Sequence, residues 1–399
     1  MRYDFTTILD RTGKDSEAFE VDPIPGVQIR EGFSRIPMWI ADMSFATAPS
    51  VQNAMLQRLQ HPAYGYFNPS AAYYDAILGW QSDRTGMSGL TRENIGYENG
   101  VLGALSSALR VLCAPGDSVL VHSPTYIGFT KTLRSSGLNM VHSPLVQDDG
   151  GVWRMDYADM DRKIKENKIH TAILCSPHNP SGRVWERGEL EAAMEVFKDN
   201  DVAVISDEIW SDLLMVGEKH IPTQSVSEDA KNRTVAFYAP SKTFNLAGLV
   251  GSYHIIYNKT LRERVEKAGA VTHYNDMNVL SMHALIGAYS SEGRDWLEEL
   301  RQVLTDNVAF ACDYIARRFQ GVDVTRPQGT YILFLDCTRW CREHNRSLDE
   351  LLRAGAEVGV MWQDGRAFNG PCHIRMNLSL PTKLLKEAME RLDKYAFNG

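Results

Sequence analysis

The middle of the chain alternates short apolar runs with amphipathic segments, and this alternation constrains the fold more than any other feature of the sequence. The strand-like runs between about residues 95 and 257 include 118–122, 170–174, 202–206, 235–238 and 252–257. Strands that alternate with helices are typical of a parallel sheet with helices on both faces. The sequence therefore predicts an α/β protein with a doubly wound, mostly parallel sheet.

The rest of the chain predicts a second, smaller α+β domain. After residue 257 the pattern becomes helical, with a long amphipathic stretch at 294–319, and strand-like segments follow at 331–335 and 373–380. A length of 399 residues suits about two domains. We expect an N-terminal arm with part of the small domain in 1–45, a large domain in 46–285, and the small C-terminal domain in 286–399.

Charge and hydropathy exclude several classes of partner. The net charge of −8 argues against nucleic acids and anionic membranes, which attract basic surfaces. The sequence shows neither a run of about 18 apolar residues nor a basic start followed by an apolar stretch and a cleavage site. These observations predict a cytoplasmic protein with no nucleic-acid or membrane partner.

The cysteines predict neither disulfides nor a metal site. The six are Cys113, Cys175, Cys312, Cys337, Cys341 and Cys372. A chain of this size does not need disulfide bonds for stability, so we expect buried, reduced thiols. Cys337, Cys341 and His344 lie close together in the sequence, but no second pair of ligands accompanies them.

Three polar residues, Asn179, Asp207 and Lys242, follow successive apolar runs. Open α/β sheets bind ligands at the carboxyl ends of their strands, so we expect the three side chains to share one crevice. Pyridoxal phosphate needs an amine to form a Schiff base, a carboxylate beside its pyridinium nitrogen and a donor near its ring hydroxyl. Lys242, Asp207 and Asn179 match these three needs respectively, which predicts a site for this cofactor.

Each of these residues also has an ordinary structural explanation. An isolated lysine in a polar loop is usually a solvated surface charge, Asp207 could cap a helix, and Asn179-Pro180 could be a simple turn. The string Ser-Lys-Thr-Phe-Asn-Leu-Ala-Gly around Lys242 is poor in other charges and follows a strand. This setting and the shared order favour the cofactor site.

The remaining cofactor contacts come from the first half of the chain and from the residue before the lysine. Gly100 precedes an expected helix, so the backbone N–H groups of Val101 and Leu102 could bind a phosphate at the positive helix end, and Ser241 could add a hydroxyl. Tyr126 follows the next strand and could stack on the pyridine ring. A glycine that only shapes the turn and a tyrosine packed in the core are the structural alternatives.

Two further residues complete the predicted site. Arg375 lies in an alternating segment that buries Ile374 and Met376 on one side, and its planar guanidinium could bind the carboxylate of an amino-acid substrate. An exposed arginine on a strand is the alternative. Tyr66, in Tyr-Gly-Tyr-Phe at 64–67, is a candidate phosphate donor from a neighbouring subunit, although neighbouring aromatic residues usually pack together.

Nearly the whole chain resembles the fold-type I superfamily of pyridoxal phosphate enzymes, and more closely its MalY/PatB-type cystathionine β-lyases, or cysteine C-S lyases. The motifs that support the resemblance are the lysine string, Pro-Met-Trp-Ile-Ala-Asp-Met at 37–43, Tyr-Gly-Tyr at 64–66, Asp-Glu-Ile-Trp-Ser-Asp at 207–212 and Pro-Gln-Gly-Thr-Tyr at 327–331. The resemblance implies the roles given above for Lys242, Asp207, Asn179, Tyr126 and Arg375. It also implies a homodimer in which Tyr66 reaches the partner's site, with two equivalent sites per dimer.

Several positions depart from related patterns. Val250 stands where many aminotransferases of the superfamily carry an arginine, and Trp210 stands where many have a tyrosine. Both differences favour the lyase subgroup. Within that subgroup, Ser44 replaces a frequent acidic residue and Glu98-Asn99 replaces a more usual Thr-Pro, which predicts an altered substrate preference.

The predicted function is β-elimination of a sulfur-containing amino acid, with cystathionine as the leading substrate and cysteine or another S-conjugate next. Lys242 would remove the α-proton, and the products would be a thiol, pyruvate and ammonia.

The alternative is an aminotransferase, which uses the same lysine and aspartate. A third possibility comes from the subgroup, some of whose members also bind a transcription regulator. A protein that only binds would be expected to lose Lys242, Asp207 or Arg375, and all three are present.

Overall fold

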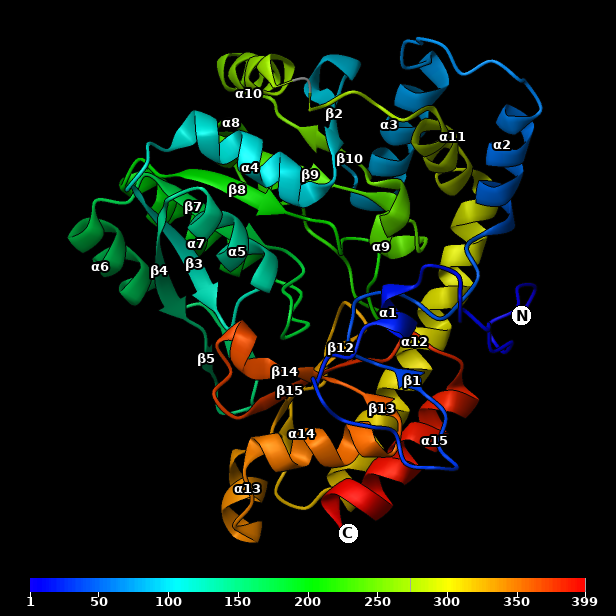
Figure 1. The fold of residues 1–399 in the computed structure, drawn as a ribbon. Helices are drawn as coiled ribbons and strands as arrows, with labels where there is room; N and C mark the ends of the chain where they lie inside the picture. Colours follow the sequence, from blue (N-terminus) through cyan, green and yellow to red (C-terminus); the bar gives the residue numbers. More distant parts are fainter. Residues whose placement is uncertain (273, 399) are drawn as a thin grey trace.

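A seven-stranded mixed sheet forms the centre of the computed structural model, which describes residues 1–272 and 274–398 (Figure 1). The strands lie in the order β2 (Ile95–Asn99), β10 (Gly251–Ile255), β9 (Thr234–Tyr238), β8 (Ala203–Asp207), β7 (Thr171–Cys175), β3 (Ser118–Ser123) and β4 (Asn139–Pro144). The strands from β9 to β4 are parallel, whereas β10 runs antiparallel to both of its neighbours. The predicted α/β fold with a mostly parallel sheet is confirmed.

Helices cover both faces of this sheet, which is why its inner strands are apolar almost throughout. On one face, the helices α4 (Val101–Leu112), α5 (Ile127–Ser135) and α10 (Lys259–Val271) share a hydrophobic cluster with Val119 and Val121. On the other face, the helices α6 (Tyr157–Asn167), α7 (Arg187–Asp199) and α8 (Glu228–Arg233) share a second cluster with Leu120. The alternation of neighbouring residues along β3 thus fills two separate cores.

The C-terminal part contains a second, antiparallel sheet with the order β11 (Asp323–Val324), β12 (Ile332–Asp336), β15 (His373–Asn377) and β14 (Gln363–Asp364). The helices α12 (Ser291–Arg318), α14 (Leu348–Glu357) and α15 (Thr382–Leu392) share its hydrophobic core. Near the N-terminus, β1 (Ile36–Pro37) pairs in parallel with β13 (Val360–Met361). The N-terminal segment therefore packs on C-terminal elements, whereas the domain boundaries at residues 45 and 285 remain predictions.

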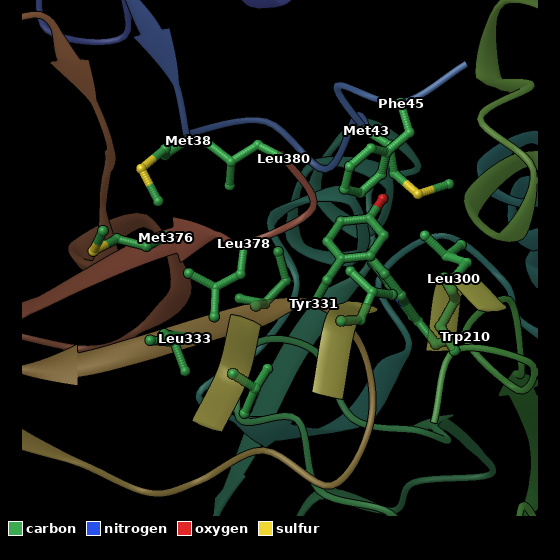
Figure 2. Close-up of a cluster of buried hydrophobic side chains, with 14 of the residues drawn as sticks. Met38, Met43, Phe45, Trp210, Leu300, Tyr331, Leu333, Met376, Leu378 and Leu380 are labelled. Carbon is green, nitrogen blue, oxygen red and sulfur yellow. The ribbon is translucent and has the colours of Figure 1, made fainter. Parts of the chain in front are cut away.

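A hydrophobic cluster joins these parts of the chain (Figure 2). Met43 and Phe45 from the N-terminal segment lie beside Tyr331, which directly precedes β12. Trp210, three residues beyond the end of β8, packs against the Tyr331 ring edge-to-face, with a centroid distance of 4.8 Å. This contact ties the carboxyl edge of the large sheet to the start of the small one.

The remaining elements are a group of three helices and several short segments. α2 (Pro49–Leu59), α3 (Ala71–Thr85) and α11 (Val279–Ala288) pack together (Figure 1). The short elements are α1 (Glu17–Glu20), β5 (Val146–Gln147), β6 (Trp153–Arg154), α9 (Pro240–Thr243) and α13 (Thr338–His344). None of the helices in the described ranges is both long enough and apolar enough to cross a membrane.

The predicted strand at 373–380 differs from the observed one. β15 ends at Asn377, and Arg375 is only 2% exposed although it lies opposite the apolar side chains of Ile374 and Met376. β15 is an inner strand of the small sheet, between β12 and β14, and its residues from Ile374 to Asn377 are all buried. The alternative of an exposed strand arginine is therefore wrong.

Candidate active site

A cavity of about 300 Å³ lies at the carboxyl ends of β7, β8 and β9. Its lining comes from segments spread over more than 200 residues of the chain. The lining residues are Ala41, Asn99, Gly100, Val101, Leu102, Gly103, Tyr126, Cys175, Asn179, Asp207, Ile209, Trp210, Ser241, Lys242, Ala247, Val250 and Gly251. The predicted site residues are all among them except Arg375 and Tyr66.

Lys242 extends from the short helix α9, whose first residue is Pro240. Its Nζ atom donates a hydrogen bond of 2.9 Å to the carbonyl oxygen of Ala41 in the N-terminal segment. Burial, and then the positive charge of Arg375, lower the pKa of Lys242 to about 8, although Asp42 and other carboxylates oppose this. A substantial fraction of the amine is therefore neutral at mildly alkaline pH, as a nucleophile or base requires.

Asp207 is the last residue of β8 and is 4% exposed. One carboxylate oxygen accepts a hydrogen bond of 3.1 Å from the backbone N–H of Ile209 within a turn, and no helix starts there for it to cap. Asp207 forms no salt bridge within the described part of the chain. Burial, and then the charge of Glu208, raise its pKa to about 7, so a cationic ligand group would stabilise its ionised form.

Glu208, the neighbour of Asp207, is fully buried and anchors the edge of the sheet. It accepts hydrogen bonds of 2.6 Å from His220 and from the Tyr238 hydroxyl, and one of 3.0 Å from the backbone N–H of Thr223. Burial opposes ionisation, but His220 and these donors lower the pKa of Glu208. The network fixes the ends of β8 and β9, and it was not predicted from the sequence.

Arg375 lies next to the cavity through its contact with Asn179. Its Nε atom donates to the side-chain oxygen of Asn179 at 3.4 Å, and Nη1 donates to Gln363 at 2.8 Å and to the Trp39 carbonyl at 3.0 Å. The guanidinium also lies 5.0 Å from the centre of the Phe368 ring. Burial lowers the pKa of Arg375 to about 10, and no carboxylate pairs with it in the described ranges.

The N-terminus of α4 faces the cavity, and within residues 1–272 and 274–398 no backbone acceptor meets its first two N–H groups. Gly100 precedes the helix at φ +79° and has no side chain to cap it, so the N–H groups of Val101 and Leu102 are available to a ligand. A Cβ at Gly100 would also lie 3.2 Å from the Val250 side chain. Ser241, in α9, lines the same cavity.

Tyr126 lines the cavity from the start of α5, and Gly128 leaves the space for its ring. A Cβ on Gly128 would lie 2.3 Å from the Cε1 atom of Tyr126. This requirement could not be predicted, because Gly128 follows Tyr126 by two positions within an ordinary helix start. The structure thus identifies a glycine that holds an aromatic ring in the cavity wall.

Gly128→Ala is expected to weaken pyridoxal phosphate binding roughly tenfold, because the added methyl group must displace the Tyr126 ring. Gly188→Ala is the matched control, since Gly188 also lies in the first turn of a helix and a Cβ there meets nothing within 4 Å. Fluorescence titration of both variants measures the affinity. Equal affinities would show that the ring position does not matter for binding.

Tyr66 does not reach the cavity within one chain. Its side chain is fully exposed, and it lines a separate surface hollow with Tyr64, Tyr97 and Met277. The prediction that Tyr66 acts in a neighbouring subunit is therefore not tested by the single chain.

The unusual positions of the sequence are divided between the cavity and the core. Glu98 is fully buried and binds His254 Nδ1 at 2.7 Å, whereas Asn99 lines the cavity. Ser44 donates its backbone N–H to the Ser379 carbonyl and is not among the lining residues. Val250 lines the cavity where an arginine would add a positive charge.

Comparisons with known proteins agree with this geometry. The family model described as aminotransferase class I and II matches residues 40–392. Cystathionine beta-lyase PatB of Bacillus subtilis is 32% identical over 90% of this chain and 91% of its own, and protein MalY of Escherichia coli is 29% identical over 98% of both. The crystal structure of a PLP-bound C-S lyase from Staphylococcus hominis superposes with a TM-score of 0.90, at 29% identity, over 100% of this chain and 99% of that one.

The match covers both the cavity and the two sheets that position it. The relatives span the same length as this chain, so the similarity is not confined to one part of the fold. The chain therefore belongs to the aminotransferase class I and II family, with the MalY/PatB cystathionine β-lyases among its relatives.

Proposed function

We propose that this protein is a pyridoxal phosphate-dependent carbon–sulfur lyase that cleaves cystathionine or a similar S-substituted cysteine. The observation that carries the proposal is the convergence of three groups at or beside one cavity: a lysine with a lowered pKa, a buried aspartate and, through its contact with Asn179, a buried arginine. Within residues 1–272 and 274–398, the aspartate has no paired cation and the arginine has no paired carboxylate. Lyases among the relatives support this reaction over amino transfer.

The polar groups around the cavity fit the cofactor. Asp207 would face the pyridine nitrogen, and the side-chain amide of Asn179 would donate to the ring oxygen, because its own oxygen already accepts from Arg375. The backbone N–H groups of Val101 and Leu102, with Ser241, would bind the phosphate, and Tyr126 would cover one face of the ring. Pyridoxal phosphate supplies an electron-withdrawing ring that stabilises negative charge on the substrate's α-carbon.

The residues of the chain then bind the substrate and move its proton. Arg375 is held by Gln363 and the Trp39 carbonyl, so its planar guanidinium is oriented before the α-carboxylate arrives. Lys242 would hold the cofactor through Nζ, and its neutral amine would remove the substrate's α-proton. Loss of the β-sulfur group as a thiol, followed by hydrolysis, leaves pyruvate and ammonia.

Arg375→Lys is expected to raise the KM for the substrate roughly 10- to 100-fold with a smaller change in kcat, because a lysine cannot form two parallel hydrogen bonds with a carboxylate. Steady-state kinetics with cystathionine measure both constants. Arg366→Lys, at an exposed arginine of the turn before β15, is the control and should leave KM unchanged. If Arg375→Lys leaves KM unchanged, another residue must bind the substrate's carboxylate.

The reaction is tested by incubating the purified protein with cystathionine and measuring pyruvate and free thiol. Their release in equal amounts is the expected result, and the absence of both would refute the lyase proposal. The family also contains aminotransferases, so the same preparation should be tested with an amino donor and a 2-oxo acid. A new amino acid without release of thiol would establish the aminotransferase alternative.

We further propose that the active form is a homodimer in the cytoplasm. Tyr64, Tyr66 and Phe67 expose aromatic surface on one loop, and Leu56 and Leu59 expose apolar surface on the preceding helix, which favours burial against a second copy. Tyr66 would then bind the phosphate in the partner's cavity. All six cysteines are free thiols, which supports a reducing compartment.

A further inference from the structure

Two cysteines far apart in the sequence meet at the surface of the C-terminal part. Cys341 lies in α13, and Cys372 lies in the turn that leads into β15. Their Sγ atoms are 3.6 Å apart, and both residues are partly exposed. The prediction of buried thiols is confirmed for Cys175, Cys312 and Cys337, and it is wrong for Cys113, Cys341 and Cys372.

The backbone around this pair is fixed by contacts that do not involve the two sulfur atoms. The N–H of the buried Cys337 donates to the Cys372 carbonyl at 2.9 Å, which holds the turn against the start of α13. His344 bonds through Nδ1 to the Trp340 carbonyl and stacks on the Trp340 ring. The two thiols therefore stay close together, while His344 is engaged elsewhere.

We propose that Cys341 and Cys372 form a dithiol modification site that closes to an intramolecular disulfide when it reacts with a low-molecular-weight disulfide. An S–S bond of about 2.05 Å requires the sulfur atoms to approach by roughly 1.5 Å, which side-chain rotation and a small shift of the exposed turn can provide. Partial exposure gives a small disulfide access to the pair. The chemistry is independent of the cavity and of the proposed lyase reaction.

The reaction consists of two thiol–disulfide exchanges. The Cys372 thiolate attacks one sulfur of the small disulfide, forms a mixed disulfide and expels one thiolate. Cys341 then attacks the Cys372 sulfur, forms the internal disulfide and expels the second thiolate. Two protein thiols are oxidised, one disulfide is reduced to two thiols, and the two protons leave with the released thiols.

Cys372 is assigned the first attack because of the surroundings of Cys341. Burial, and then the neighbouring Cys372 thiol, raise the pKa of Cys341, which disfavours its thiolate in an initial encounter. Once Cys372 is in the mixed disulfide, Cys341 is already beside the sulfur that it must attack. Cys113, the other partly exposed cysteine, has no second sulfur within hydrogen-bond distance in the described ranges.

The test uses glutathione disulfide at about pH 8.5, where thiolates are more abundant. The intact mass of the wild-type protein should fall by two hydrogens without a bound glutathione, and peptide mapping should find Cys341 linked to Cys372. Dithiothreitol should restore the original mass. Cys341→Ser should instead retain one glutathione on Cys372, because the resolving thiol is missing.

Cys113→Ser is the matched control and should lose two hydrogens as the wild type does. The proposal is overturned if Cys341 or Cys372 of the wild type keeps a stable glutathione adduct, if the two thiols stay reduced, or if the linked peptides contain another cysteine. Peptide mapping of the wild type decides the question even if a variant fails to fold. Since the readout is mass rather than turnover, the result does not depend on the lyase proposal.

Discussion

Lys242→Ala is expected to lower the rate of elimination by roughly 10⁴-fold or more, because it removes both the covalent attachment of the cofactor and the base that takes the α-proton. No other lysine lines the cavity in the described ranges, so no second amine is placed to replace it. Pyridoxal phosphate should still bind through the phosphate and ring contacts, but more weakly and without a covalent bond.

Two measurements separate these effects. Single-turnover kinetics with cystathionine measure the loss of proton transfer, and borohydride reduction followed by peptide mapping locates the covalent attachment. In the wild type the label should map to Lys242, whereas the variant should carry none. Lys259→Ala, which removes an exposed lysine of α10, is the control and should behave as the wild type. A label on another residue would refute the assignment of Lys242 as the residue that binds the cofactor covalently.

The large sheet and the positions that converge at its edge could be predicted because each depends on local sequence. Strands buried on both faces leave continuous apolar runs, as in 203–207 and 234–238, and parallel strands bring their carboxyl ends together. Asp207 and Lys242 follow such runs directly, so their convergence required only the topology. Arg375 could be placed on a strand without knowledge of the topology, since an alternating segment with one arginine already indicated a strand.

The support around these residues could not be predicted, because it depends on contacts between distant parts of the chain. Glu208 meets Tyr238 across 30 positions, and Lys242 meets the Ala41 carbonyl across 201. No local pattern records such pairs. The requirement for Gly128 depends on the rotamer of Tyr126, and a role for Tyr66 needs a second chain. The reacting groups could therefore be predicted from the sequence, whereas most of the groups that orient them could not.

Asp207→Asn is expected to lower kcat of the loaded enzyme roughly 10²- to 10³-fold, because an amide cannot stabilise a protonated pyridine nitrogen as a carboxylate does. Asn has the same shape as Asp, so the fold of the turn should persist. Steady-state kinetics measure the change. Asp201→Asn is the control, since Asp201 is exposed and lies two residues before the start of β8. A kcat within threefold of the wild type would exclude Asp207 from the cofactor site.

The same substitution lowers kcat but should raise the stability of the cofactor-free protein. The pKa of Asp207 is raised from 3.8 to about 7, so the folded state binds more protons than the unfolded state between these values and stability falls as pH rises. At pH 8 the cost of ionising the buried carboxyl is on the order of 4 kcal/mol, and asparagine does not incur it.

Cofactor-free Asp207→Asn should therefore unfold at a higher temperature than the cofactor-free wild type at pH 8, and the difference should shrink toward pH 4. Thermal unfolding followed by circular dichroism across this range tests the sign, and a difference that does not vary with pH would contradict it. Pyridoxal phosphate should stabilise the wild type more than the variant, because its protonated ring nitrogen offsets the buried charge. A carboxylate that destabilises the protein until a cationic ligand binds acts in recognition rather than in folding.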